Sequence, residues 1–475
     1  MSSKSYILVK NTLIFSIANL GSKIIQFLLV PLYTFTLTTA EFGIVEFIMT
    51  VANLLTPLIS CSISDGLLRF GLDKAEDGKI ILTNSFAIVF IGTVISIFLL
   101  PILNLISNIN QYLFFFLAIL NIRIYRDLLS INLKIKDKNK LFAVENIVFT
   151  FCIALLSYLF LKIFSLGING YFSALLISNV ISIIFLFVVG NVPDSLNKEY
   201  LDKQVIKKLV FYSFPMIINA LSWWISNSAD RIMMNYYLTS EDLGIYGVAA
   251  RIPSLLTTFT GIFNQAWVIS AITSVGEVDR KKFYLKTYKE FMTIVFVISS
   301  LLIMFSRQVI ILFTGPEFQA AWLYVPFLVT GVAISSLAGF FGTIYLAKKE
   351  NNILMWTTII GAVSNIVVNL FFIPFLGIIG ATLSNILTWL LILILRLFLD
   401  KDKLLSKNEV FQILSYVFIL IIQSYCIQVS YAVGFFASVI VFMIVVISNR
   451  KIIISMISSI YLKIGRRNGK IQKDL

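Results

Sequence analysis

The chain alternates between long apolar segments and short polar connections from one end to the other. We count fourteen apolar segments of about 20 residues, the length that an α-helix needs to cross a bilayer. A transmembrane barrel would instead show alternating strands of about ten residues. The pattern therefore predicts an all-α integral membrane protein. The approximate cores of the segments are residues 11–35, 43–64, 80–104, 111–133, 141–164, 168–190, 211–235, 243–272, 288–313, 321–346, 353–373, 376–399, 409–430 and 432–449.

Composition leads to the same conclusion. Hydrophobic residues make up 59% of the 475 positions and charged residues 13%, with a mean hydropathy of +0.93. A soluble protein of this length needs far more charge on its water-facing surface. A soluble globular protein is therefore excluded.

The basic residues are distributed unevenly. Lys and Arg number 38 against 24 Asp and Glu, which gives a formal net charge of +14. Of the 38, 31 lie before the first apolar segment, in every second connection or in the C-terminal tail. This positive-inside pattern predicts that both termini are cytoplasmic. It also accounts for the net charge without a nucleic-acid partner.

One phrase of the sequence occurs twice. Residues 37–45 read LTTAEFGIV, and residues 238–246, at an offset of 201, read LTSEDLGIY. A second pair, at 166–170 and 376–380, follows in the same order at an offset of 210. The two matches predict a duplication. Since six segments precede the second copy, both copies start from the same side of the membrane and form parallel repeats.

The predicted domain organisation follows from this duplication. Residues 1–190 are expected to form an N-terminal lobe of six helices, and residues 211–400 a second six-helix lobe. Residues 191–210 are the longest interior interruption of the hydropathy and would form a cytoplasmic linker. Residues 401–475 would add two accessory transmembrane helices and a basic cytoplasmic tail. We thus expect about 14 transmembrane helices, arranged as two parallel six-helix lobes plus two C-terminal helices.

The polar residues of the first segment recur at steps of three and four, so they share one helix face. Such a stripe cannot face lipid. Packing between helices through small polar side chains explains Ser and Thr, but it leaves a lysine in the middle of a span uncompensated. We therefore favour a water-filled cavity. The stripe consists of Thr12, Ser16, Asn19, Lys23 and Gln26. Prolines within later segments, Pro57 and Pro253 among them, are expected to bend their helices.

Ionisable residues inside the apolar segments are the candidate site residues. The cations are Lys23, Arg123, Arg126, Arg231 and Arg251, and the clear acids are Glu46, Asp127 and Asp230. A structural ion pair between Arg123 and Asp127 is one interpretation, but it leaves Arg126 over. The count predicts an interior with two more positive than negative charges. Since guanidinium groups bind phosphate oxygens well, the expected ligand is anionic and phosphorylated.

Three tryptophans lie near these charged segments, at positions 223, 224 and 267. Aromatic residues near the ends of spans are typical of interfacial belts. Stacking against a sugar ring is the alternative interpretation.

Catalysis is not expected. The sequence has no histidine, and Cys61, Cys152 and Cys426 are isolated, so neither a zinc site nor a disulfide is predicted. A multi-span glycan polymerase or acyltransferase is the hypothesis from another class. Such enzymes need a reactive group of side chains, often on a sizeable external loop, whereas the predicted outer connections here are short. We therefore predict that the protein is not an enzyme.

The number of segments, the two repeated phrases and the charged interior together resemble a known family. They are similar to those of the Wzx-type polysaccharide flippases, which transport O-antigen repeat units. These flippases belong to the multidrug/oligosaccharidyl-lipid/polysaccharide (MOP) exporter superfamily. The resemblance covers nearly the whole chain, although its motifs are short. It implies transport of undecaprenyl-diphosphate-linked oligosaccharide from the inner to the outer leaflet of a bacterial cytoplasmic membrane, for O-antigen or capsule synthesis.

The resemblance also implies roles and partners. Lys23, Arg123, Arg126, Arg231 and Arg251 would line a cationic cavity that binds the substrate, and Glu46, Asp127 and Asp230 are candidates for coupling to an H+ or Na+ gradient. No other cofactor or metal is implied. Partners are the lipid-linked oligosaccharide and the bilayer, with a glycan polymerase and a chain-length regulator as further candidates. A lipid II flippase is the alternative. Antiporters of cationic drugs belong to the same superfamily, but they would need an acid-rich site. The predicted excess of positive charge counts against them.

Overall fold

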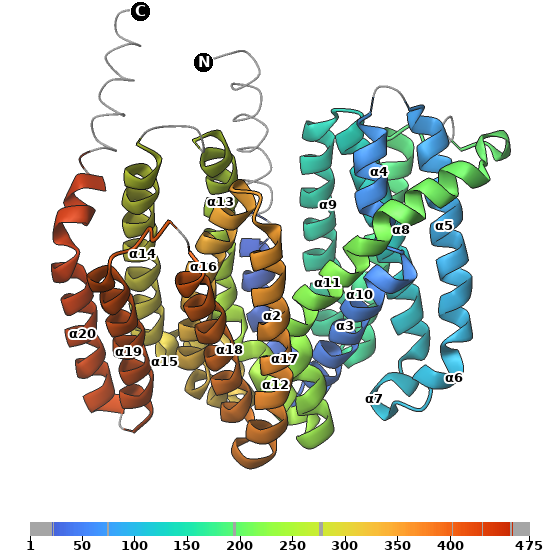
Figure 1. The fold of residues 1–475 in the computed structure, drawn as a ribbon. Helices are drawn as coiled ribbons and strands as arrows, with labels where there is room; N and C mark the ends of the chain where they lie inside the picture. The colour runs from blue at the N-terminus through green and yellow to red at the C-terminus, as the bar shows by residue number, and fades with distance from the viewer. Residues whose placement is uncertain are drawn as a thin grey trace, which may run out of the picture. The chain divides into compact units, whose positions relative to one another are not determined.

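The computed structural model describes residues 21, 23–73, 76–192, 196–274, 279–400, 402–429, 431–456 and 458. These residues form helices joined by short connections (Figure 1). The prediction of an all-α protein is confirmed. Two predicted features lie outside the described residues: most of the polar stripe of the first segment and the basic tail beyond residue 458.

The first half of the chain contains both long helices and short ones. Their bounds are α2 (Val30–Thr36), α3 (Thr39–Ile59), α4 (Ile63–Gly71), α5 (Gly78–Phe98), α6 (Leu100–Leu103), α7 (Ser107–Asn110), α8 (Leu113–Ile135), α9 (Asn139–Ser157), the π-helix η1 (Tyr158–Ile163), α10 (Gly167–Val189) and the 3-10 helix η3 (Lys198–Tyr200).

The second half continues in the same manner. Its helices are α11 (Lys203–Tyr237), α12 (Ser240–Ala249), α13 (Arg251–Thr273), α14 (Arg280–Met304), α15 (Ser306–Phe313), the 3-10 helix η4 (Pro316–Leu323), α16 (Val325–Ala347), α17 (Asn351–Leu376), α18 (Ile378–Phe398), α19 (Lys407–Val429) and α20 (Tyr431–Ser448).

Among the described residues, 11 helices are long and apolar enough to cross a membrane, or up to 12 if the bent pair at the end of α20 is one span. The 23-residue α8 is long enough, but Arg123, Arg126 and Asp127 interrupt its apolar character. The described part of the first segment, Lys23–Thr36, is apolar but short. The protein is therefore an all-helical membrane protein, and the number of fourteen spans stays a prediction.

Several predicted single helices are broken in the structure, and the segments 43–64 and 243–272 are two of them. The predicted segment 43–64 divides into α3 and α4, because Cys61 and Ser62 adopt left-handed backbone conformations with φ of 51° and 47°. Pro57, which cannot donate a helical hydrogen bond, lies just before this break. The predicted segment 243–272 divides at Ala250 into α12 and α13, and Pro253 occupies the first turn of α13, where proline is tolerated.

The helices pack into two compact units. Unit 1 consists of residues 1–248, 313–320 and 362–381, and unit 2 consists of residues 249–312, 321–361 and 382–475. Within unit 1, α8, α9 and α10 pack against one another, and within unit 2 α16 packs against α13, α14 and α19. The two units are defined by how densely their residues pack, whereas the predicted lobes are defined by the sequence repeat. The predicted lobe boundaries therefore stay a prediction.

The core of unit 2 is centred on α16, because 83% of its most apolar stretch is buried. Aromatic rings fill the space beside it. Trp267, 3% exposed, stacks on Phe340 with ring centroids 4.5 Å apart and makes an edge contact with Tyr284. A sugar needs at least one exposed ring face to stack on, and Trp267 has almost no exposed surface. Trp267 is therefore a packing residue, and the sugar-stacking alternative is wrong for this tryptophan.

The starts of α3 and α12 show the same local geometry at the predicted offset of 201. Thr38 and Glu41 form a capping box at α3, and Thr239 and Asp242 form the equivalent one at α12. The two phrases also touch. A side chain on Gly43 would overlap the carbonyl of Ser240, and a side chain on Gly244 would overlap the carbonyl of Thr39. These contacts are reciprocal at the same offset, as in a two-fold related pair.

Candidate functional site

Glu46, Asp230 and Arg231 come together in unit 1, where α3, α11 and α12 meet. The Nε atom of Arg231 lies 3.8 Å from Oε2 of Glu46. Asp230, 3% exposed, accepts a hydrogen bond from the Tyr246 hydroxyl and another from the backbone N–H of Arg231 at 3.0 Å. Gly247 faces Glu46, and its missing side chain leaves room for the carboxylate stem. Three of the eight predicted site residues therefore form one cluster, with two carboxylates and one cation.

Arg126 belongs to a second cluster in unit 1. Its Nε and Nη2 atoms each lie 2.8 Å from Oε1 of Glu145 on α9, and Nε also donates to the Ser182 hydroxyl of α10 at 2.9 Å. Ser182 donates to the same carboxylate oxygen. The guanidinium carbon lies 3.6 Å from the centre of the Phe149 ring. Arg126 thus has a carboxylate, a hydroxyl and an aromatic face as partners.

Arg123 and Asp127 lie on the same helix, α8, but within the described residues no ion pair joins them. Nη1 of Arg123 is buried and has no hydrogen-bond partner there, and Asp127 is exposed. The alternative interpretation of a neutral Arg123–Asp127 strut therefore has no ion pair to support it. A guanidinium whose buried N–H group is unused can donate a hydrogen bond to an anion.

The remaining two predicted residues lie apart from both clusters. Lys23 is exposed and donates to Gln26 at 3.3 Å, one helical turn further on. Arg251 is half-buried at the start of α13 and belongs to unit 2. The structure thus groups Glu46, Asp230 and Arg231, and it does not gather all eight predicted residues at one point.

Sequence reasoning missed Glu145, although it lies within the predicted segment 141–164. Glu145 is fully buried, and its Oε2 atom has no hydrogen-bond partner among the described residues. With Glu145 included, the predicted site residues of unit 1 and this acid comprise four cations and four carboxylates. Arg251 belongs to unit 2 and lies outside this count, so the excess of two positive charges over the whole interior stays a prediction. The sequence feature that could have revealed Glu145 is an acidic residue inside an apolar segment. The same feature identified Glu46.

Arg396 was missed as well. It lies in α18, is 5% exposed, and donates to the Ala338 carbonyl at 2.6 Å and to the hydroxyls of Thr357 and Thr358 at 3.2 Å each. Gly342 leaves room for the guanidinium, because a side chain there would approach Nη1 closely. The hydrogen-bond acceptors of Arg396 within the described residues are all neutral groups, so dipoles compensate its charge. Arg396 and these acceptors all belong to unit 2.

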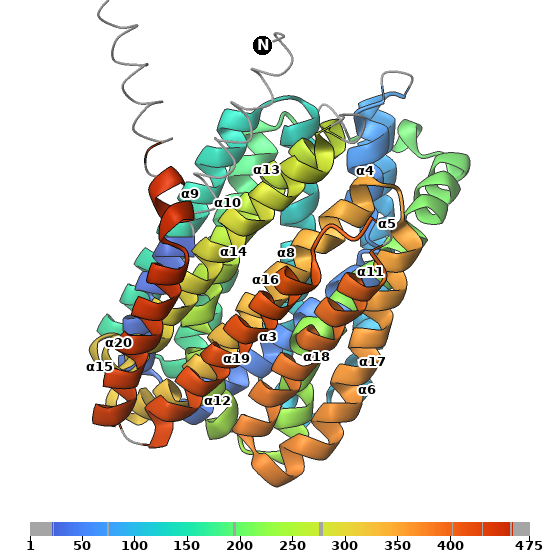
Figure 2. The ribbon, with the colours of Figure 1, turned by 60° about the vertical axis from the view of Figure 1, so that its left-hand side comes forward.

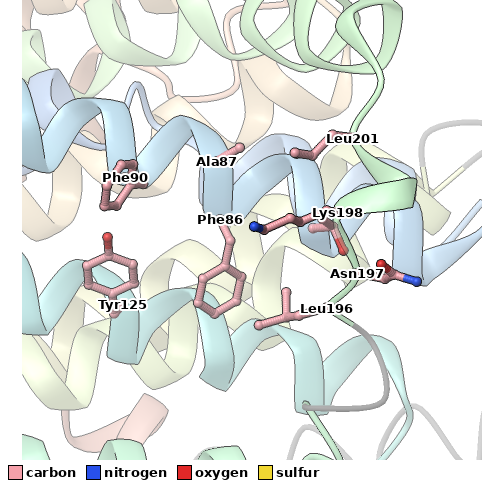
Figure 3. Close-up of a pocket in the computed structure, with 9 residues that line it drawn as sticks. Phe86, Ala87, Phe90, Tyr125, Leu196, Asn197, Lys198 and Leu201 are labelled. Carbon is pink, nitrogen blue, oxygen red and sulfur yellow. The ribbon is translucent and has the colours of Figure 1, made fainter.

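A groove in unit 1 has a volume of about 440 Å³ and is lined mostly by apolar side chains (Figure 3). Phe86, Ala87 and Phe90 of α5 form one wall, and Lys198 extends toward it from the segment after residue 195. Asn84 holds that segment in place, since its amide donates to the Tyr200 carbonyl at 2.8 Å and accepts from the backbone N–H of residue 202 at 2.9 Å. None of the eight predicted site residues lines this groove.

Within the described residues, no group of three or more His, Cys, Asp or Glu side chains is arranged to hold a metal ion. The two clusters of unit 1 can bind an anion through guanidinium donors or accept a proton on a carboxylate.

Comparison with solved structures identifies the fold. The chain is similar to the lipid II flippase MurJ in an inward closed conformation, with a TM-score of 0.70 and 15% identity over 93% of this chain and 100% of that one. It is also similar to a multidrug resistance MATE family transporter of the MOP superfamily. The inward-facing structure gives a TM-score of 0.66 at 16% identity (81% and 97% covered), and the outward-facing structure 0.59 at 16% (83% and 95%).

Comparison at the level of sequence is narrower. No curated protein matches the chain. The sequence profile described as "Polysaccharide biosynthesis protein" matches residues 8–273, which is more than half of the 475 residues. The chain shares its fold with MurJ and with MATE family transporters. The resemblance to the family of Wzx-like proteins is confirmed, and the chain belongs to the polysaccharide biosynthesis protein family.

Proposed function

We propose that the protein is a flippase that moves undecaprenyl-diphosphate-linked oligosaccharide repeat units across the cytoplasmic membrane of a bacterium by alternating access. Membership of the polysaccharide biosynthesis family carries the proposal. A polysaccharide built from lipid-linked units needs a transporter for them, and the fold is shared with a protein that is itself named a lipid flippase. The product would enter O-antigen or capsule synthesis, with a glycan polymerase and a chain-length regulator as partners. Both termini would be cytoplasmic.

Arg123 is the residue of unit 1 that we assign first to the diphosphate. Arg126 and Arg231 have carboxylates beside them, whereas Nη1 of Arg123 has no partner among the described residues. A planar guanidinium with unused donors can make the charge-assisted hydrogen bonds that phosphate oxygens accept. Arg251 in unit 2 is the second arginine that we assign to the diphosphate, and Lys23 would add a further positive charge.

The test is surface glycan in a flippase-deficient host. Arg123→Ala and Arg251→Ala should abolish surface glycan while the protein still inserts, and the Lys variants should restore part of it. Arg69→Ala is the matched control, because Arg69 is 58% exposed on α4 and its one ion pair within the described residues is with Asp73, at 3.9 Å. This control should support normal glycan. Normal glycan levels in both of the other Ala variants would reject the assignment.

Coupling to an H+ or Na+ gradient is the second part of the proposal, with Glu46, Asp127 and Asp230 as candidates. Asp127 is exposed, whereas Asp230 is buried against the Tyr246 hydroxyl. The two carboxylates would therefore bind a proton in different surroundings. Transport of a labelled lipid-linked oligosaccharide into vesicles is measured with and without a proton gradient. Undiminished transport after the gradient has collapsed would remove the three carboxylates from proton coupling, and replacing Na+ by K+ tests the other ion.

A lipid II flippase is the second candidate function, and the similarity to MurJ favours it. The two functions differ in the sugar that is carried on the same kind of lipid. Complementation separates them: growth of a strain depleted of its lipid II flippase would support the second candidate. Restored surface polysaccharide in a strain lacking its repeat-unit flippase would support the first.

A further inference from the structure

Three lysines of α14 lie on one face of the helix at the edge of a groove in unit 2. Lys282, Lys286 and Lys289 are spaced four and three residues apart, which places them along one side. The groove has a volume of about 250 Å³, and its lining is completed by Leu285 and Glu290 of α14 together with Ile452 and Ser455. The last two residues follow α20, which packs beside α14 (Figure 2).

The opposite wall of the groove belongs to a bent end of the chain. The helical axis turns by 66° between Ala432–Ser448 and Arg450–Met456. A segment that turns this far from a membrane-spanning helix runs closer to the plane of the membrane. Arg450 and Lys451 at its start are exposed and basic, and the isoleucines that follow include Ile454, which is 63% exposed. Basic and apolar residues in succession are typical of a segment at the lipid headgroups.

The charges around the groove leave one positive charge over. Lys289 pairs with Glu409 at 2.6 Å, and Lys286 lies 3.9 Å from Glu290 with its side chain 72% exposed. Lys282 forms no ion pair within the described part of the chain. Three lysines against two carboxylates leave one positive charge at this face of α14, and Arg450 and Lys451 on the opposite segment add two more. The groove therefore offers an excess of positive charge to an anionic headgroup.

We propose that this groove is a binding site for an anionic phospholipid of the phosphatidylglycerol type. Lys282 and Lys286 bind the phosphodiester, and Leu285 and Ile452 pack against the glycerol and the upper part of an acyl chain. The apolar lining and the adjoining interfacial segment select a lipid over a free phosphate ion. The bound lipid joins the end of α20 to α14, two helices that the predicted organisation assigns to different parts of the chain.

Native mass spectrometry of the full-length protein in neutral detergent tests this site with added phosphatidylglycerol and phosphatidylcholine. We compare K282Q/K286Q with K203Q/K207Q, in which two exposed lysines of α11 have the same four-residue spacing and lose the same charge. Each lysine near an anionic headgroup contributes about fivefold in affinity. Phosphatidylglycerol should therefore bind K282Q/K286Q at least tenfold more weakly, with binding to the control double variant unchanged.

Three results would overturn the proposal. Equal losses in the two double variants would mean a general effect of charge, and an unchanged affinity in K282Q/K286Q would remove the lysines from lipid binding. Displacement of the lipid by millimolar phosphate or pyrophosphate would mean a site for the free anion. If the double variant fails to fold, K282Q alone gives the same test, because it breaks no described ion pair. Its expected loss is about fivefold.

Discussion

Arg126 and Arg396 both lie inside apolar helices, yet the protein compensates their charges in different ways. Arg126, with a side chain 14% exposed, pairs with the fully buried Glu145 in unit 1. Arg396, 5% exposed, is surrounded in unit 2 by a carbonyl and two hydroxyls. The first arrangement places two opposite charges out of water, and the second satisfies one charge with neutral dipoles. A cation in a span therefore indicates neither a nearby acid nor a ligand by itself.

The largest effect is expected from Arg126→Leu. Removing this cation leaves Glu145 buried with an uncompensated charge, and breaking one partner of a buried ion pair costs about 3–5 kcal/mol. Adding Glu145→Gln to the same chain removes the orphaned charge and should restore most of the stability. Thermal unfolding of both variants in detergent measures the difference. If the double variant is no more stable than Arg126→Leu alone, the two residues are not energetically coupled.

Arg396→Leu should cost less, about 2 kcal/mol. It removes three hydrogen bonds to neutral groups, but the hydroxyls of Thr357 and Thr358 keep their bonds to backbone carbonyls of α17, so no buried charge is orphaned. The same unfolding assay applies, and Arg396→Lys should recover part of the loss. A loss as large as that of Arg126→Leu would mean that a carboxylate compensates Arg396 after all.

Arg231→Gln extends the comparison to a looser pair. Arg231 lies 3.8 Å from Glu46, and the two side chains are 22% and 12% exposed, so water and neighbouring dipoles share the compensation. Asp230 keeps the hydrogen bond from Tyr246 in this variant. The expected loss of unfolding free energy is about 1 kcal/mol. Glu46→Gln should lose a similar amount, and a loss above that of Arg396→Leu in either variant would contradict this ranking.

The smallest effect on stability is expected from Asp402, which lies outside the spans. Its carboxylate lies 2.9 Å from Lys348 and 2.8 Å from Arg280. The hydrogen bond from Lys348 lowers the pKa of Asp402 below its usual value of 3.8, with help from the positive charge of Arg280. A carboxylate with a lowered pKa contributes stability at neutral pH, which is lost as the pH falls through that lowered pKa.

Because the Asp402 side chain is 43% exposed, this contribution is below about 1 kcal/mol. Melting temperatures between pH 7 and pH 3 measure it, with Asp402→Asn as the reference. The wild type should melt higher than Asp402→Asn at pH 7, and the difference should shrink toward pH 3. A difference that stays constant over this range would remove Asp402 from the pH dependence.

The sequence by itself determined that this is an all-helical membrane protein of the polysaccharide biosynthesis type. Hydropathy is a local property, because about 20 apolar residues are enough to specify a span wherever the chain folds. The capping phrases at the starts of α3 and α12 are local in the same sense, since each box is completed within four residues. These features could be read without knowing which helices are neighbours.

Only the tertiary structure decided which charges meet. Arg126 and Glu145 are 19 residues apart on different helices, and the partners of Arg396 are 38 to 58 residues away. Their pairing depends on which faces of α8, α9, α16, α17 and α18 turn toward one another, and helical periodicity does not specify the neighbour that a face meets. The break between α3 and α4 was likewise undetermined, because the left-handed conformation of Cys61 is unfavourable locally and persists only where tertiary packing compensates it.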